Sequence, residues 1–326
     1  MRQIAVVDRR PDVLADVRSG FPAAMAFTDF FAALPYVDAV VIATPPSTHF
    51  DLATSALREG KHVLVEKPLA MSTEESVLLC EEARSAECLL MVGHTFLHNP
   101  AVKELQRRIV GGELGTIYYL HSVRLNLGLY RIDVNVVWDL APHDITIMNY
   151  LLQSLPTSVS AWGVTLASGA IEDVAYVRLD YGHLDVSGFC HVSWLDPRKL
   201  RTVTVVGEKR MAVYDDLAEE RLRIFDRGIY AANVDTPLYA RPLSYRYGDI
   251  VSPHISSEEP LAAEDQYFID RIFDGRDRDT IGLNGIAVVA VLQAIDRSLH
   301  ERRTVDVEYP SCLGPDLWAE QQWIGS

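Results

Sequence analysis

Cysteine, long apolar runs and metal-binding patterns are scarce in this chain of 326 residues. Its four cysteines are scattered and form no Cys-x-x-Cys pair, which is typical of buried, reduced thiols in a cytoplasmic protein. The ten histidines show no His-Glu-x-x-His or similar spacing, so we expect no metal site. No apolar run approaches the roughly 18–20 residues that span a bilayer, and the first residues do not resemble a signal peptide.

Positive charge is also in short supply. The chain has 30 Lys and Arg residues against 45 Asp and Glu residues, which gives a formal net charge of −15. Nucleic acids and anionic membranes require a basic face, so this balance argues against both as partners. It does not exclude an anionic cofactor, because a few local dipoles can hold a phosphate.

The third absence concerns glycine. A Gly-x-Gly-x-x-Gly turn lets the backbone approach the pyrophosphate of a dinucleotide, and no segment of this chain has that spacing. The glycines of residues 111–115 are spaced differently and follow a helical pattern. The first apolar segment, residues 4–7, runs instead into Asp8 and Arg9.

What is present is a change of pattern near residue 98. Before it, short apolar runs alternate with helical patterns, which favours βαβ units and a buried parallel sheet. We therefore predict an α/β domain over residues 1–98, with an incomplete Rossmann-type sheet. Its expected strands are residues 4–7, 39–43, 62–65 and 89–92, and its expected helices are residues 12–18, 48–60 and 73–85.

Residues 99–326 instead contain longer segments of alternating polarity with tight turns, which predict an α+β domain with a large, mostly antiparallel open sheet. Residues 226–261, rich in Tyr, Pro and Ser, are interpreted as a long excursion. The expected strands are residues 116–124, 159–166, 171–181, 183–194, 201–206 and 211–214, and the expected helices are residues 101–110, 137–152, 262–273 and 283–301.

Glu66-Lys67-Pro68 directly follows an apolar strand. Parallel α/β sheets carry their chemistry at the carboxyl ends of the strands. Partial burial at such a position lowers the pKa of a lysine and lets it exchange protons. The alternative is an ordinary lysine at the end of a strand, paired with Glu66.

A second polar cluster lies about seventy residues later. Asp139 and His143 are four residues apart, so on a helix they share one face, as an orienting carboxylate and an acid or base would. Asp139 can equally be a complement to the helix dipole. Because an interior proline is costly outside the first turn, Pro142 predicts that the helix proper starts near His143.

Taken together, these motifs resemble the glucose–fructose oxidoreductase / inositol dehydrogenase (Gfo/Idh/MocA) family of nicotinamide-dependent sugar dehydrogenases. The resemblance covers nearly the whole chain, with four motifs in the family's order and spacing. They are Thr44-Pro45-Pro46-Ser47-Thr48-His49, Glu66-Lys67-Pro68, Gly112-Glu113-Leu114-Gly115 and Asp139-x-x-x-His143.

The resemblance implies hydride transfer between a sugar carbon and nicotinamide, with NAD or NADP as cofactor. Lys67 and His143 would handle the proton and hold the hydroxyl, in either assignment, and Asp139 would support them. The residues expected to bind the cofactor are Asp8, Arg9, Thr44, Pro45, Thr48, His49, Glu66 and Lys67.

Residues 124–135, which precede the Asp139-x-x-x-His143 motif, resemble the corresponding segment of family members encoded with nucleotide-sugar and polysaccharide pathways. The arginines of this segment can clamp a diphosphate in bidentate fashion, although the segment can equally be a solvated loop. The expected substrate-binding residues are Arg124, Asn126, Arg131 and Asn135.

On the family pattern, residues 4–7 resemble the second Rossmann strand, whose terminal acid binds the adenosine ribose. Asp8 then favours NAD over NADP, although Arg9 can accommodate a 2′-phosphate; alternatively Asp8 is a helix N-cap. The first βα unit, of about 30 residues, would be missing. Three explanations stay open: a start site placed too far downstream, a natural truncation, or strands that re-pair and still hold cofactor weakly.

Three functions stay open as well. The first is a dehydrogenase or ketoreductase of a nucleotide-linked sugar, and the second is a cofactor-free binding or scaffolding partner of a related enzyme. The third is NAD-assisted glycoside cleavage or lyase chemistry on the same fold. The open sheet predicts a homodimer or homotetramer, because a broad apolar face tends to pair with a copy of itself.

Overall fold

The computed structural model describes residues 3–128, 131, 133–167, 169–230, 244–274 and 282–313. The chain divides into two compact units, Met1–Gly93 with Tyr267–Ile286, and His94–Gln266 with Ala287–Ser326. The sequence suggested one boundary at residue 98, whereas the first unit also takes in a late segment. Phe268 explains this, because its buried ring packs against Leu64, Leu89 and Met91 of the first unit.

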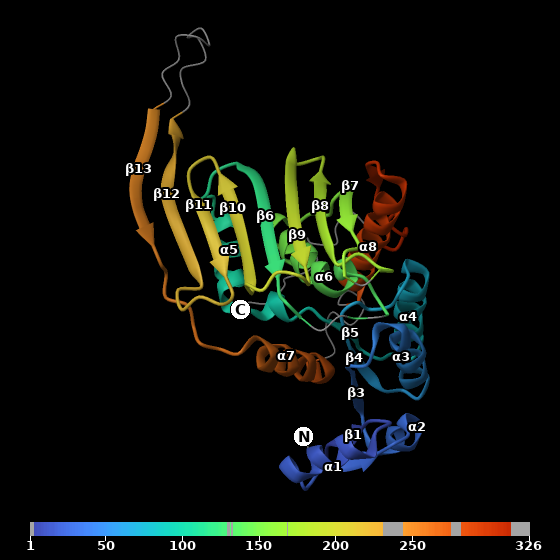
Figure 1. Ribbon diagram of the computed structural model, residues 1–326. Coiled ribbons are helices and arrows are strands. Elements are labelled where there is room, and N and C mark those ends of the chain that lie inside the picture. The colour runs from blue at the N-terminus through green and yellow to red at the C-terminus, as the bar shows by residue number, and fades with distance from the viewer. Residues whose placement is uncertain are drawn as a thin grey trace. The chain divides into compact units, whose positions relative to one another are not determined.

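The first unit consists of parallel strands alternating with helices (Figure 1). The βαβ pattern expected from the sequence is confirmed, and the two elements that it missed, β2 and α2, have only three and four residues. The strands are β1 (Ala5–Val7), β2 (Met25–Phe27), β3 (Ala39–Ile42), β4 (His62–Glu66) and β5 (Leu90–Gly93). The helices are α1 (Pro11–Gly20), α2 (Phe30–Ala33), α3 (His49–Arg58), α4 (Thr73–Ser85) and, from Tyr267 onward, α7 (Pro260–Asp274).

The parallel strands of this unit form two separate sheets. One pairs β1 with β2, and the other has the order β3-β4-β5. The strands of the second sheet differ in burial: Val63 in β4 is fully buried, whereas Val41 in β3 is 59% exposed. Val7 at the end of β1 is exposed as well. Among the described residues, β1 and β3 therefore each have a strand neighbour on one side only.

Helix α4 begins where the sequence predicted, because its first turn is capped on both sides. The hydroxyl of Ser72 accepts the amide N–H of Glu75 at 3.1 Å. The carboxylate of Glu75 in turn accepts the amide N–H of Met71 at 3.2 Å. Such reciprocal caps satisfy amides that have no partner inside the helix.

The second unit contains a nine-stranded sheet in the order β13-β12-β11-β10-β6-β9-β8-β7-β14 (Figure 1). Among the described strands β6 and β9 run parallel and the other neighbours antiparallel, which confirms the predicted fold class. The strands are β6 (Ile117–Leu125), β7 (Ser158–Val164), β8 (Val174–Tyr181), β9 (Val186–Ser193), β10 (Leu200–Gly207), β11 (Met211–Asp215), β12 (Leu222–Tyr230), β13 (Ser244–Val251) and β14 (Val305–Asp306).

Helices lie on one face of this sheet. Helix α5 (Pro100–Val110) contacts β11, and α6 (Val136–Leu152) contacts β6, β8 and β9. Helix α8 (Leu283–Glu301) joins β7 through Ser298, whose hydroxyl accepts the amide N–H of Ala161 at 2.9 Å. The alternate residues of β6 to β9 point to the other face and include exposed aromatic rings such as Trp162. Among the described helices, none has the length and apolar character needed to cross a bilayer.

Two expectations from the sequence are corrected here. The excursion expected over residues 226–261 is wrong in part, because β12 and β13 form a paired hairpin inside it. Its alternation is hard to read because the register shifts between Phe225 and Arg227 and because Tyr245 and Tyr247 of the edge strand are exposed. Residues 231–243 lie outside the described part.

The second correction concerns α6: the helix expected over residues 137–152 is confirmed, but the inference from Pro142 that the helix proper starts near His143 is wrong. The helix begins at Val136, seven residues before His143, and Pro142 lies inside it. The side chain of Asn135 explains the early start, because its oxygen accepts the amide N–H groups of Val137 and Trp138, both at 3.1 Å. This cap supports the first turn, and the largely buried helix tolerates the interior proline.

Candidate active site

The carboxyl ends of β3, β4 and β5 lie at one edge of the three-stranded sheet. The register pairs Ile42 with Val65 and Glu66 with Gly93, so these strands end side by side. Lys67, which follows β4 directly, is half-buried. The loop that starts at Thr44 leaves the same edge from β3. The first unit therefore brings Lys67 and the Thr44 loop together, as the sequence predicted from strand ends.

His49 joins these two segments. Its ring is completely buried at the start of α3. The Nδ1 atom lies 2.7 Å from the carbonyl oxygen of Pro68, and the Nε2 atom lies 2.9 Å from the carbonyl oxygen of Thr44. The Lys67–Pro68 peptide bond is cis. One buried side chain thus contacts both loops that the sequence assigned to the site.

The loop after β3 also has internal order. The hydroxyls of Thr44 and Thr48 lie 2.7 Å apart, and that of Thr48 donates to the carbonyl of Pro45 at 2.8 Å. Thr44 and Pro45 remain exposed. The loop thus offers exposed polar groups to a ligand on a backbone that its own side chains hold in shape.

Asp8 follows the last residue of β1, in the position of an acid that binds ribose hydroxyls. Its carboxylate accepts the amide N–H of Arg10 at 2.8 Å and lies beside the guanidinium of Arg10. The hydrogen bonds from Arg10 lower the pKa of Asp8, so the group is ionised at neutral pH. Arg9 is exposed beside it.

The residues of the first unit fit a nicotinamide dinucleotide in part. The carboxylate of Asp8 suits an adenosine ribose, and the exposed Thr44 and Pro45 with nearby Lys67 suit the nicotinamide end. The pyrophosphate would need a glycine-rich turn, and the sequence contains none with that spacing. The unit thus matches the two ends of the cofactor better than its centre.

In the second unit, Asp139 and His143 both lie on α6, one turn apart. Asp139 has two donors on its carboxylate: Nε of Arg131 at 2.9 Å and the indole Nε1 of Trp194 at 3.0 Å. Arg131 and Asp139 were both predicted as site residues, and the structure brings them together. Trp194 was missed, because nothing in its local pattern distinguishes it from an ordinary core residue.

The imidazole of His143 packs against Phe96. The two rings are 4.9 Å apart between centroids and meet edge to face, at 71°. The guanidinium carbon of Arg124 lies 4.7 Å from the centre of the same Phe96 ring. Phe96 was also missed, although aromatic packing of this kind fixes the orientation of an imidazole.

Arg124 and Asn135 are engaged inside the protein. Arg124 is buried and forms an ion pair with Asp144 of α6. The amide nitrogen of Asn135 donates to Glu172 and to Asp296, both at 3.2 Å, while its oxygen caps α6. Asn126, the remaining residue of the expected substrate set, is half-buried. Of that set, Arg131 is the one with a substantially exposed side chain.

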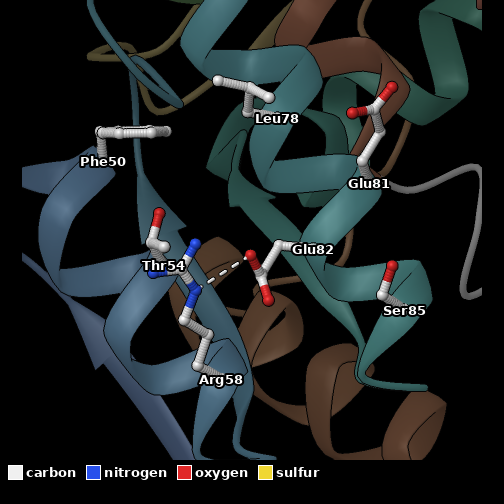
Figure 2. Close-up of a pocket in the computed structure, with 7 residues that line it drawn as sticks. All are labelled: Phe50, Thr54, Arg58, Leu78, Glu81, Glu82 and Ser85. Atoms are coloured by element: carbon white, nitrogen blue, oxygen red, sulfur yellow. Dashed lines mark hydrogen bonds and ion pairs between the residues drawn. The ribbon is translucent and has the colours of Figure 1, made fainter.

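A hollow of about 270 Å³ lies elsewhere in the first unit, between α3 and α4 (Figure 2). An ion pair of 3.1 Å between Arg58 and Glu82 crosses it. The hollow is lined by Phe50, Thr54, Arg58, Leu78, Glu81, Glu82 and Ser85. None of these is a predicted site residue.

Within the described ranges, no group of three or more His, Cys, Asp or Glu side chains is arranged to hold a metal ion.

Two family models match the chain in order. Residues 2–94 match the oxidoreductase family Gfo/Idh/MocA with its NAD-binding Rossmann fold, and residues 102–213 match the Gfo/Idh/MocA C-terminal domain. The UDP-N-acetylglucosamine 3-dehydrogenase of Acidithiobacillus ferrooxidans is 31% identical over 223 residues, which are 68% of this chain and 67% of that protein. The chain belongs to the Gfo/Idh/MocA family.

Solved structures agree with this assignment. The structure of the dehydrogenase GnnA from A. ferrooxidans, which acts on UDP-N-acetylglucosamine, has a TM-score of 0.76 and 27% identity, covering 91% of this chain and 89% of that one. GenD2 from gentamicin A biosynthesis, solved with NAD, has a TM-score of 0.77 and 25% identity, covering 94% and 88%. The protein is thus an NAD(P)-dependent oxidoreductase of the Gfo/Idh/MocA type, in a family whose characterised relatives include sugar dehydrogenases.

Proposed function

We propose that this Gfo/Idh/MocA protein oxidises a hydroxyl carbon of a nucleotide-linked sugar, or reduces the matching carbonyl, with Lys67 and His143 as its proton-handling residues. The position of Lys67 carries the proposal. It is half-buried, directly follows β4 and lies at the same sheet edge as the Thr44 loop. A lysine in such a site can hold or exchange the hydroxyl proton.

The remaining roles follow from this assignment. Bound nicotinamide would supply the hydride acceptor or donor. His143 would bind the substrate hydroxyl or exchange its proton together with Lys67. Phe96 would hold the imidazole of His143 in place. Asp139 supports the site from one turn earlier, and Arg131, ion-paired to it, is available to a phosphate.

The similarity to UDP-N-acetylglucosamine 3-dehydrogenase supports a nucleotide-linked substrate. The test is turnover of UDP- and dTDP-sugars with NAD or NADP, followed by absorbance and by mass spectrometry of the product. Lys67→Met should lower kcat by about 10²- to 10⁴-fold. Lys61→Met is the matched control, because Lys61 precedes β4 whereas Lys67 follows it. Full activity in Lys67→Met, or no oxidised sugar at all, would contradict the proposal.

A binding or scaffolding role without turnover is the second candidate. The division of the parallel strands into two sheets favours it, because the pyrophosphate region of the fold lies where the central strand would be. Calorimetry with NAD and NADP separates the two candidates. Micromolar binding supports the enzyme, and no detectable binding at millimolar cofactor supports the scaffold.

We also propose that the open face of the large sheet pairs with a second copy of the chain. Trp162, Tyr176 and His191 form a row of rings on β7, β8 and β9. The Tyr176 and His191 rings are stacked at 4.0 Å, and the Trp162 ring lies 5.9 Å from that of Tyr176 with a tilt of 46°. Trp162 is 58% exposed. An exposed aromatic patch of this kind favours isologous association.

Sedimentation tests this pairing. The parent protein should sediment as a dimer or tetramer at micromolar concentration, and Trp162→Glu should shift it to monomer. Phe273→Glu on α7 is the control, because that ring is also exposed but belongs to the first unit and not to the sheet. A parent protein that sediments only as a monomer at this concentration would contradict the proposed pairing.

A reducing, cytoplasmic setting is proposed for the enzyme as well, because its four cysteines are scattered and form no Cys-x-x-Cys pair.

A further inference from the structure

Pro142 interrupts the hydrogen-bond ladder of α6 one residue before His143. A proline has no backbone N–H, so the carbonyl of Trp138, four residues earlier, loses its usual helical partner. Helices bend at breaks of this kind. The direction of the His143 side chain therefore depends on what else holds this turn of the helix.

Thr146 provides such a contact. Its hydroxyl donates to the carbonyl of Pro142 at 2.7 Å, and that carbonyl belongs to the peptide group that joins Pro142 to His143. Thr146 is buried, with 3% of its surface exposed, so water does not compete for this bond. A threonine that bonds back to the carbonyl four residues earlier often bends the helix. Thr146 and Pro142 together thus set the path of the backbone at His143.

The Thr146 hydroxyl also has a partner outside the helix. Its Oγ1 atom lies 3.3 Å from Nδ1 of the buried His94. The hydroxyl has one hydrogen, which goes to the nearer carbonyl of Pro142, so the ring of His94 is the donor in this longer contact. The hydroxyl cannot rotate away without losing a bond. This second contact distinguishes Thr146 from a threonine that bonds only to its own helix.

The segment that begins with His94 contacts His143 directly as well. Phe96, two residues after His94, packs edge to face against the imidazole of His143, with 4.9 Å between the ring centroids. Positions 143 and 146 are three residues apart on α6 and are therefore neighbours on one face of the helix. One short segment thus holds this face at both positions.

We propose that Thr146 is a positioning residue for His143. Through its bond to the Pro142 carbonyl, the hydroxyl holds the backbone at the angle that keeps the imidazole of His143 against Phe96, and His94 keeps the hydroxyl in that orientation. The effect on catalysis rests on the proposed role of His143, whereas the effect on the position of its imidazole does not.

Proton spectra of the histidine rings, recorded without substrate or cofactor, test this position. A nearby aromatic ring shifts the signals of an imidazole, so those of His143 depend on its distance from Phe96. His143→Gln identifies these signals among those of the ten histidines, and Phe96→Leu shows where they move when the contact is lost. Thr146→Val keeps the shape of the side chain but removes the hydroxyl, and it should move the signals toward the Phe96→Leu positions. Thr146→Ser keeps the hydroxyl and should leave them near those of the parent protein.

Ser76→Ala is the matched control. The Ser76 hydroxyl donates to the carbonyl of Ser72, four residues earlier, at the same 2.7 Å, and Ser76 is completely buried in α4. This variant loses the same kind of bond in a helix of the first unit that carries none of the predicted site residues, so it should leave the His143 signals unchanged. Unchanged His143 signals in Thr146→Val, or equal displacements in Thr146→Val and Thr146→Ser, would overturn the proposal.

Turnover tests the consequence for catalysis. Because misplacing a reacting group by about 1 Å can cost on the order of 10²-fold in rate, Thr146→Val should lower kcat by about 10- to 100-fold and leave KM for the sugar within about twofold. Thr146→Ser and Ser76→Ala should keep the kcat of the parent enzyme. An active parent enzyme whose kcat is unchanged in Thr146→Val would overturn the positioning role and leave the proposed function standing. A parent protein that oxidises no sugar, with displaced His143 signals in Thr146→Val, would refute the proposed function and support the positioning of His143 by Thr146.

Discussion

Arg124 and Asp144 form a buried two-point ion pair. Nε of Arg124 donates to Oδ2 of Asp144 at 3.0 Å, and Nη2 donates to Oδ1 at 3.1 Å. Their side chains are 6% and 1% exposed. Strand β6 carries the arginine, and α6, which also carries Asp139 and His143, carries the aspartate. The pair therefore ties the helix of the proposed catalytic residues to the sheet.

Breaking this pair should be costly because it leaves one buried charge without its counter-charge. We expect Asp144→Asn and Arg124→Met each to lower the free energy of unfolding by about 3–5 kcal/mol, measured with denaturant. The double variant Arg124→Met/Asp144→Asn should cost less than the sum of its two singles. Glu82→Gln, which breaks the exposed pair with Arg58, should cost about 1 kcal/mol or less. Single variants at Asp144 that cost no more than this control would contradict the prediction.

How far the sequence predicts this site depends on where each residue lies along its element. Lys67 and Thr44 could be placed together because parallel strands end at one edge, so order along the chain predicts proximity. Arg124, the last residue of the strand expected over residues 116–124, could not be assigned in the same way. Its partner Asp144 lies twenty residues away on another element, and a single sequence does not reveal such a pair.

The fold shows the same division. Helix α4 was predicted to the residue because Ser72 and Glu75 provide local signals at its start. The range of α6 was predicted to within one residue, but the inference from Pro142 that the helix proper starts near His143 was wrong, because Asn135 caps the helix about two turns earlier. The hairpin of β12 and β13 was missed because a register shift in β12 and the exposed tyrosines of the edge strand β13 obscure the alternation of apolar and polar residues.

Asn135 allows a test that separates structure from substrate binding. Asn135→Ala removes the side-chain acceptor of two amide N–H groups and should cost about 1–2 kcal/mol of stability. Asn135→Asp keeps the cap but places a third carboxylate beside Glu172 and Asp296, so its loss of stability should shrink as pH is lowered. Ser72→Ala, the matched cap variant of α4, should lose stability without any change in KM. A rise in KM for Asn135→Ala alone would restore its role in substrate binding.

His98 should make stability depend on acidic pH. Burial, assisted by the positive charges of Lys103 and His94, lowers the pKa of His98 to about 3 from the ordinary value of 6.5. The unfolded chain therefore takes up a proton below pH 6.5 while the native ring stays neutral until about pH 3. Stability should fall as pH drops through this window, by up to about 1.4 kcal/mol per pH unit.

The measurement is denaturant unfolding between pH 7 and pH 4. His98→Gln removes the titrating group, so the slope of the free energy of unfolding against pH should decrease by the contribution of about one proton. His300→Gln, at an exposed position near the end of α8, should leave the slope of the parent protein unchanged. Equal slopes in the parent protein and His98→Gln would show that the ring is already protonated or accessible to water in the native state.

The exposed edges of β1 and β3 lead to the last prediction. In a doubly wound sheet the strand order 3-2-1-4-5-6 places one strand between the second and the fourth, which correspond here to β1 and β3. Strands of a parallel sheet are normally buried on both faces, as Val63 in β4 is, whereas Val41 in β3 is 59% exposed. An apolar strand with a Gly-x-Gly-x-x-Gly turn and a helix, joined ahead of Ile4, would complete the sheet.

Two measurements test this extension. Hydrogen exchange should slow at the backbone amides of β1 and β3. NAD affinity measured by calorimetry should rise at least tenfold, because the turn supplies amide donors for the pyrophosphate. The same extension with its three glycines changed to valine is the control: it should protect the amides without raising the affinity, since a side chain there keeps the backbone away from the phosphates. Unprotected amides with both extensions would mean that the two sheets do not leave room for a strand, and equal affinities with both would mean that the turn is not what the cofactor needs.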